Sequence, residues 1–161
     1  QKTGVPVHEW ELASLPDEDS QNWQESFRTV RQFMTTDLFT VRPTDIIDLA
    51  VKLMTWEQIR HIPVEDENGM LKGIVSHREL LKLIAQGTRR DDEEPLLVSD
   101  VMSDPPATVE PTTPTLQAIA LMRKHRASSL PVVSEGKLLG LITGGDFMEV
   151  ARRLLERHFA D

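Results

Sequence analysis

Gly73-Ile74-Val75-Ser76 and Gly140-Leu141-Ile142-Thr143 carry one pattern twice: a glycine, two large apolar residues and a hydroxyl side chain. Consecutive apolar residues without alternation are typical of a strand that is buried on both faces. A carboxylate follows three residues after each hydroxyl, as Glu79 in the first copy and Asp146 in the second. Each copy therefore predicts a buried strand that leads directly into a helix.

The similarity extends upstream of this pattern through three more segments, each displaced by 68 residues. Chance similarity does not hold register over so many landmarks, so the chain contains an internal repeat. The matched pairs are residues 32–37 with 100–105, 40–43 with 108–111, and 62–64 with 130–132.

Each copy predicts the element order β-α-β-β-α. A short extended piece containing Thr-Val-x-Pro comes first, and an amphipathic helix follows it. In the first copy we expect Thr44 to be the N-cap of this helix, with Ile47, Val51 and Met54 lining its buried face. A strand with the apolar-Pro-Val pattern, a glycine turn, the second strand and a closing helix complete the copy.

Neither copy buries enough apolar surface to be comfortably stable alone. We therefore expect an α/β fold of the α+β type, in which the two repeats pack sheet to sheet with pseudo-twofold symmetry and helices outside. The expected segments are an acidic N-terminal arm or linker at residues 1–29, the first repeat at 30–85, an acidic linker at 86–97, and the second repeat with a C-terminal helix at 98–161.

Charge and composition limit the classes of partner. The net charge is −8 at pH 7, and residues 1–29 alone hold six acidic and two basic side chains. Duplex nucleic acid requires a basic surface, so it is not an expected partner. No apolar run is long enough to span a bilayer, so a membrane is not expected either. The chain has no cysteine, which excludes disulfides and thiolate chemistry and fits a cytoplasmic location.

Thr143-Gly144-Gly145-Asp146 is the segment with candidate ligand chemistry. A hydroxyl at a strand end lies beside the unpaired N–H groups of the following helix, which favour a phosphate. The carboxylate of Asp146 can accept hydrogen bonds from both hydroxyls of a ribose, and Gly144 allows a ligand to approach the backbone closely. The same spacing is also a helix capping box that needs no ligand, and spacing alone favours that alternative. The two roles are compatible.

The combination of these motifs resembles the CBS-domain family over roughly residues 30–150. The resemblance rests on a methionine motif at Met34 and Met102, Thr-Val-x-Pro, apolar-Pro-Val, a glycine turn and Gly-apolar-apolar-[Ser/Thr]-x-x-[Asp/Glu], twice and in order. It identifies the chain as a tandem CBS pair, a Bateman-type regulatory module. Residues 7–10 and 39–66 are also similar to regulatory pieces found beside bacterial ATP-dependent carboxylate–amine ligases.

The resemblance implies clefts for adenosine ligands such as AMP, ADP, ATP or S-adenosylmethionine. We expect one cleft to be occupied, because the cationic Arg60, His77 and Arg78 fall toward its phosphate end. The residues that the resemblance assigns to this cleft are Thr143, Asp146, Gly144, Leu38, Phe39, Arg60, Pro63, His77, Arg78 and Ser128.

A second, weaker cleft would use Ser76, Glu79, Ala107 and Pro131. It departs from the family pattern, because Glu79 replaces the usual aspartate and carries its carboxylate one methylene farther out. Ser76-x-x-Glu79 also has the form of a capping box, and at this position we favour the cap over a ligand.

The expected function is that of a regulatory module that senses an adenine nucleotide and modulates an attached or associated enzyme, with an enzyme domain in the same chain as one possibility. We expect a homodimer, no catalytic residues and no required cofactor. The five histidines show no metal-binding spacing, so a metal site is not expected. The alternative is a dimerisation scaffold whose clefts hold nothing. An enzyme would need a nucleophile, metal or base pair that the sequence does not offer.

Overall fold

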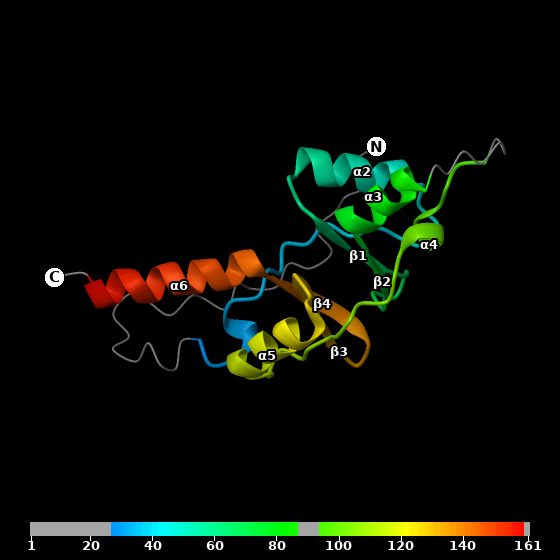
Figure 1. Cartoon of the computed structure of the whole chain (residues 1–161). Helices are drawn as coiled ribbons and strands as arrows, with labels where there is room; N and C mark the ends of the chain where they lie inside the picture. The colour runs from blue at the N-terminus through cyan, green and yellow to red at the C-terminus, as the bar shows by residue number, and fades with distance from the viewer. Residues whose placement is uncertain (1–26, 87–93, 160–161) are drawn as a thin grey trace. The chain divides into compact units, whose positions relative to one another are not determined.

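The computed structural model describes residues 27–86 and 94–159, and Figure 1 shows its helices and strands. These residues form two compact units, which are described separately. Most of the predicted N-terminal arm and more than half of the predicted acidic linker lie outside the described residues. Unit 1 contains, of the described residues, 39–86, 94–105 and 136–138, and unit 2 contains 27–38, 106–135 and 139–159.

Unit 1 is built on an antiparallel strand pair, β1 (His61–Glu65) and β2 (Leu71–Ser76). Val41 of the Thr-Val-x-Pro segment pairs in parallel with β1, and Ser103 pairs in antiparallel with β2. Both edges of the strand pair are therefore extended by single-residue bridges. The helices of unit 1 are α2 (Ile47–Trp56), α3 (His77–Ala85) and α4 (Val98–Val101).

The prediction for α2 is wrong for its N-cap and for one position of its buried face, Val51, whereas Ile47 is buried and Met54 packs against the core. The helix begins at Ile47 rather than directly after Thr44, and its N-cap is Ile46. Its buried side chains are Ile47, Ala50 and Leu53, whereas Val51 is 43% exposed. Apolar side chains occur on several sides of this stretch, so their spacing did not fix which stripe turns toward the core.

Unit 2 follows the same plan on the pair β3 (Ser129–Ser134) and β4 (Lys137–Thr143). Val109 pairs in parallel with β3, and Thr35 pairs in antiparallel with β4. The resulting order of segments is that of unit 1. The helices of unit 2 are the 3-10 helix η1 (Val30–Gln32), α5 (Thr115–His125) and α6 (Gly144–Phe159).

The two repeats exchange their first segments. Residues 27–38 come before the first repeat's strands in the sequence but pack in unit 2, and residues 94–105 pack in unit 1. The methionine motifs explain this exchange. A Cβ at Gly140 would lie 2.9 Å from Sδ of Met34, and a Cβ at Gly73 would lie 3.1 Å from Sδ of Met102. Each methionine thus packs where the strand of the other repeat has no side chain.

Equivalent positions of the two repeats form two separate cores. The strands at residues 73–75 and 140–142 are buried, which confirms the prediction made from their apolar runs. The mixed fold with two small antiparallel sheets also agrees with the expected fold class. The core of unit 1 is Val41, Ile47, Ala50, Leu53, Ile62, Val64, Val75 and Val98, and that of unit 2 is Val30, Val109, Ala118, Leu130, Val132 and Ile142.

Candidate functional site

Asp146 lies in the first turn of α6, directly after β4, and its carboxylate joins three segments of unit 2. Oδ2 accepts hydrogen bonds from the backbone N–H of Thr143 at 2.8 Å and from its hydroxyl at 3.3 Å. Oδ1 accepts a hydrogen bond from the Thr35 hydroxyl at 2.8 Å. The bond from the Thr143 N–H is one half of the capping box that the sequence offered as an alternative.

Thr35 is a site residue that the sequence reasoning missed. It follows Met34 in the methionine motif, and the repeat aligns it with Ser103, another hydroxyl. That shared hydroxyl was the available signal. It could not place Thr35 beside Asp146, because the contact exists only through the exchange of residues 27–38 into unit 2.

Open space adjoins the start of α6 at Gly144. This residue is exposed, and a Cβ placed on it would meet no atom within 4 Å. Its backbone N–H donates to the carbonyl of Ser128 at 3.3 Å, which brings Ser128 to the same place. Unit 2 thus brings together Thr143, Gly144, Asp146 and Ser128, four of the residues that the family resemblance assigns to the first cleft.

Burial raises the pKa of Asp146 above its usual 3.8, against the opposing effect of its hydrogen bonds from Thr143 and Thr35. A carboxyl with a raised pKa binds its proton more tightly in the native state than in the unfolded chain. Its contribution to stability is therefore fully present below pH 3.8 and is lost as the pH rises through the native pKa.

We expect Asp146→Asn to remove this pH dependence, because asparagine does not titrate and keeps an acceptor for the Thr143 N–H. The difference in unfolding free energy between variant and wild type should move in favour of the variant as the pH rises. Urea unfolding of both proteins from about pH 4 to pH 8 measures it. A difference that is flat with pH would contradict a raised pKa at Asp146.

Ser76 and Glu79 form the equivalent pair in unit 1, and here the favoured interpretation as a cap is confirmed. Ser76 is the N-cap of α3, and its hydroxyl oxygen accepts from the Glu79 N–H at 3.5 Å. The same hydroxyl donates to the Glu79 carboxylate. The longer glutamate side chain therefore folds back onto its own cap.

Four basic side chains gather at the end of unit 1 where β2 leads into α3. His61 pairs with Ser76 across the sheet, and the His77 N–H donates to the Arg60 carbonyl at 3.0 Å. Burial lowers the pKa of His61, and the positive charges of His77, Arg60 and Arg78 lower it further, while Glu79 raises it. We call Arg60, His61, His77 and Arg78 the cationic cluster.

The remaining predicted residues have side chains that turn into the cores. Leu38 is 4% exposed, and Pro63 and Pro131 are fully buried. Phe39 packs against the core of unit 1 and Ala107 against that of unit 2. Any contact of these five residues with a ligand would therefore use the backbone or the rim of a partly buried side chain.

Comparison with known proteins decides the family. Residues 30–86 and 98–153 each match the model of the CBS domain. The chain belongs to the CBS-domain family. The match holds two copies in tandem, so the predicted CBS pair is confirmed, together with its fold.

Three of the proteins that resemble this CBS pair are matched over most of their own length. A CBS domain-containing protein of Dictyostelium discoideum is 32% identical over 135 residues, covering 79% of this chain and 93% of that protein. YhcV of Bacillus subtilis, also a CBS domain-containing protein, is 37% identical over 119 residues, covering 73% and 81%. The crystal structure of CBSX2 in complex with AMP is 32% identical, with a TM-score of 0.71, and covers 80% of this chain and 98% of that one.

The CBS module is regulatory rather than catalytic, and this agrees with the prediction that the chain is not an enzyme in its own right. In the part of the chain that the structure describes, no three histidine, aspartate or glutamate side chains are grouped to hold a metal ion. Across the same residues, no helix combines the length and the apolar character needed to cross a bilayer.

Proposed function

We propose that this CBS pair binds an adenosine nucleotide, AMP before others, at the Asp146 site and so regulates a partner enzyme. The observation that carries the proposal is a half-buried carboxylate with open space beside it at Gly144. A related CBS protein, CBSX2, has been crystallised in complex with AMP. A carboxylate at the start of a helix suits the two hydroxyls of a ribose, as in dinucleotide-binding folds.

Binding would change the contacts of the exchanged segment. A carboxylate offers about four lone-pair sites, and Asp146 already uses three of them for Thr143 and Thr35. Two ribose hydroxyls need two sites, so the ligand would displace one of the two threonine hydroxyls, and we propose that it displaces Thr35, the only one of these donors on Oδ1. Thr35 belongs to residues 27–38, and its hydrogen bond to Asp146 joins this segment to α6. This hydrogen bond would be present in the free state and absent in the bound state. A partner that distinguishes these two states would sense the ligand.

We propose further that the cationic cluster of unit 1 contributes to nucleotide binding by attracting a phosphate group. Arg60, His77 and Arg78 are exposed and lie together at one end of a strand pair. Arginine suits this role because its planar fork can bind a phosphate through two hydrogen bonds. This contribution predicts a preference for nucleotides over the nucleoside.

A thermal-shift screen of the whole chain with AMP, ADP, ATP, S-adenosylmethionine and adenosine tests the proposal. Binding to the native state alone at 100 times the Kd adds about 2.7 kcal/mol of stability. For a chain of this size that corresponds to a rise in Tm of about 5–10 °C. No rise with any of the five compounds would refute nucleotide binding.

The same screen on Arg60→Ala tests the phosphate contact separately. We expect this variant to lose affinity for AMP and to bind adenosine as the wild type does, because adenosine has no phosphate. Equal losses for both compounds would assign Arg60 to the fold or to the nucleoside instead.

The alternative, a dimerisation scaffold without a ligand, has support of its own. Large apolar side chains are exposed on helices of both units, for example Ile84 on α3 at 75% and Met148 on α6 at 72%. Exposed apolar faces of this kind mark protein–protein contacts. Light scattering with and without AMP separates the two functions, since a scaffold would give a stable dimer that ignores the nucleotide.

A further inference from the structure

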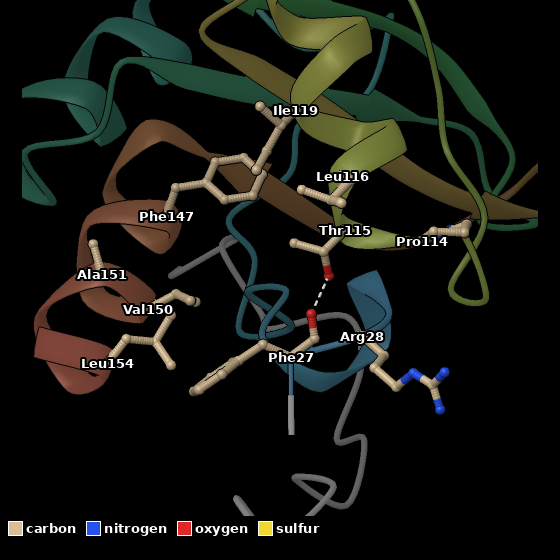
Figure 2. Close-up of a pocket in the computed structure, with 10 residues that line it drawn as sticks. All are labelled: Phe27, Arg28, Pro114, Thr115, Leu116, Ile119, Phe147, Val150, Ala151 and Leu154. Atoms are coloured by element: carbon tan, nitrogen blue, oxygen red, sulfur yellow. Dashed lines mark hydrogen bonds between the residues drawn. The ribbon is translucent and has the colours of Figure 1, made fainter. Parts of the chain in front are cut away.

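Unit 2 carries an apolar groove of about 590 Å³ that is distinct from the Asp146 site (Figure 2). One wall is a face of α6, where Phe147, Val150, Ala151 and Leu154 recur at helical spacing. The facing wall is the start of α5, including Leu116, which is 80% exposed. Phe147 packs against the core of unit 2 and Val150 is buried, whereas Ala151 is exposed, so part of this stripe borders open space.

The groove also includes the first described residues of the chain, Phe27 and Arg28. The Thr115 hydroxyl donates to the carbonyl of Phe27 at 2.5 Å, and Figure 2 shows this bond beside the groove. The Thr115 N–H donates to the carbonyl of Arg28 at 2.9 Å. The chain is thus tied to α5 at the groove, and residues 1–26 directly precede this point in the sequence.

The composition of residues 1–26 suits the groove in both apolar content and charge. The segment contains Trp10 and Trp23 together with Leu12 and Leu15, and it holds six acidic side chains against one lysine. A buried tryptophan removes roughly 150–250 Å² from water, so a single docked ring would contribute much of the binding free energy of such a segment.

The border of the groove is basic. Arg28 is exposed where it lines the groove. Beyond Leu154 the same face of α6 continues, three and four residues on, at Arg157 and His158, which are both exposed. The composition of the acidic segment with its apolar anchors is therefore complementary to an apolar floor that is bordered by Arg28 and Arg157.

We propose that residues 1–26 of the same chain dock in this groove, with Trp23 as the anchor nearest to it. Trp23 lies four residues before Phe27, so about 13 Å of extended chain separates the two, which lets its ring reach the groove. A tethered segment has an effective concentration in the millimolar range. The same segment of a second copy would have to compete for the groove at the free concentration of the protein, which is much lower.

The test uses the full chain with Trp10→Phe and Trp56→Phe, so that Trp23 is the only tryptophan. Acrylamide quenching of its fluorescence measures how far the ring is shielded from solvent. We expect Trp23 to be protected compared with the same variant unfolded in urea. Equal quenching in both states would overturn the proposal.

Ala151→Glu in the same background places a charge on the groove floor at an exposed helix position, where it leaves the core intact. We expect loss of the protection, with the quenching constant of Trp23 rising about twofold or more as the docked population falls. Leu155→Glu is the matched control. Leu155 is an apolar side chain of the same helix, 54% exposed, and it does not line the groove.

Three results would refute docking by the same chain. If Ala151→Glu leaves Trp23 protected, the ring is shielded elsewhere. If Leu155→Glu exposes it equally, the effect belongs to α6 as a whole. If protection increases with protein concentration, a second copy fills the groove. Circular dichroism of each variant separates these outcomes from a loss of folding.

Discussion

Replacing Asp146 with alanine is expected to weaken AMP binding by about 100-fold or more, because two hydrogen bonds from ribose hydroxyls to a charged acceptor are lost at about 1.5–3 kcal/mol each. At a ligand concentration that raises the wild-type Tm by about 5–10 °C, the variant should then shift by about 2 °C or less. Isothermal titration calorimetry at a fixed temperature measures the affinity directly.

The variant also loses the hydrogen bond that Asp146 accepts from the Thr143 N–H, which costs roughly 1 kcal/mol of stability. Stability and affinity must therefore be measured separately. Glu79→Ala is the matched control, since it removes the equivalent carboxylate in unit 1, where Ser76 already occupies it. We expect this control to bind AMP with wild-type affinity.

A second variant locates the ligand without touching a polar group. Gly144→Val adds side-chain atoms where a Cβ would meet nothing, so we expect it to fold normally and to block the space beside Asp146. If Asp146→Ala and Gly144→Val both bind AMP normally while Glu79→Ala does not, the occupied site lies in unit 1 and our assignment is wrong.

Gly140→Val is expected to destabilise the protein by roughly 2–3 kcal/mol, because its side chain would overpack a filled contact. A Cβ at this position would come within 2.9 Å of the Met34 Sδ and 3.0 Å of the Thr35 carbonyl oxygen. The methionine can move aside, but the backbone oxygen cannot do so without disturbing the bridge to β4. Thermal unfolding should show a fall in Tm of about 5–10 °C.

Met34→Ala tests whether this contact is the cause. Alone it should destabilise the protein, but combined with Gly140→Val it should restore part of the loss, and the coupling should reach about 0.5 kcal/mol or more. Simple addition of the two losses would show that the exchanged segment does not pack on β4 as described. Gly144→Ala serves as the glycine control, because a Cβ there meets no neighbour.

The repeat made most of each unit predictable from sequence. The buried strands at 73–75 and 140–142 followed from apolar runs, because consecutive apolar residues without alternation are typical of a strand that is buried on both faces. The buried stripe of α2 did not follow, because Val51 and Ala50 are both apolar and only packing against the sheet decides between them. Ala50 is buried because its small side chain lets the helix approach closely.

Within the candidate site, local contacts were predictable and distant ones were not. The spacing of Thr143 and Asp146 defined their cap, because both residues lie in one turn. The Thr35 hydroxyl reaches Asp146 across 111 residues of sequence, and no periodicity encodes such a pair. The burial of Leu38 has the same origin, since residues 27–38 pack in unit 2.

The exchanged segments have a consequence for how this chain folds. Thr35 pairs with Leu141, so unit 2 is closed by a contact between residues more than 100 positions apart. Contacts of high sequence separation require loop closure before they add stability, and they slow folding. During synthesis residues 27–38 emerge early, but they cannot pack in unit 2 until β4 has been made. Unit 1 is complete once residue 105 has emerged, apart from the turn at 136–138.

Truncation at either end should therefore prevent stable folding of one unit. A polypeptide that ends before residue 94 has the first two strands but lacks Val98 and Met102, which pack on them from the later repeat. One that starts after residue 38 lacks Val30 and Met34, and so leaves the second half equally incomplete. Neither repeat can complete its core alone, so we expect the pair to fold, and to be transferable to another protein, only as a whole.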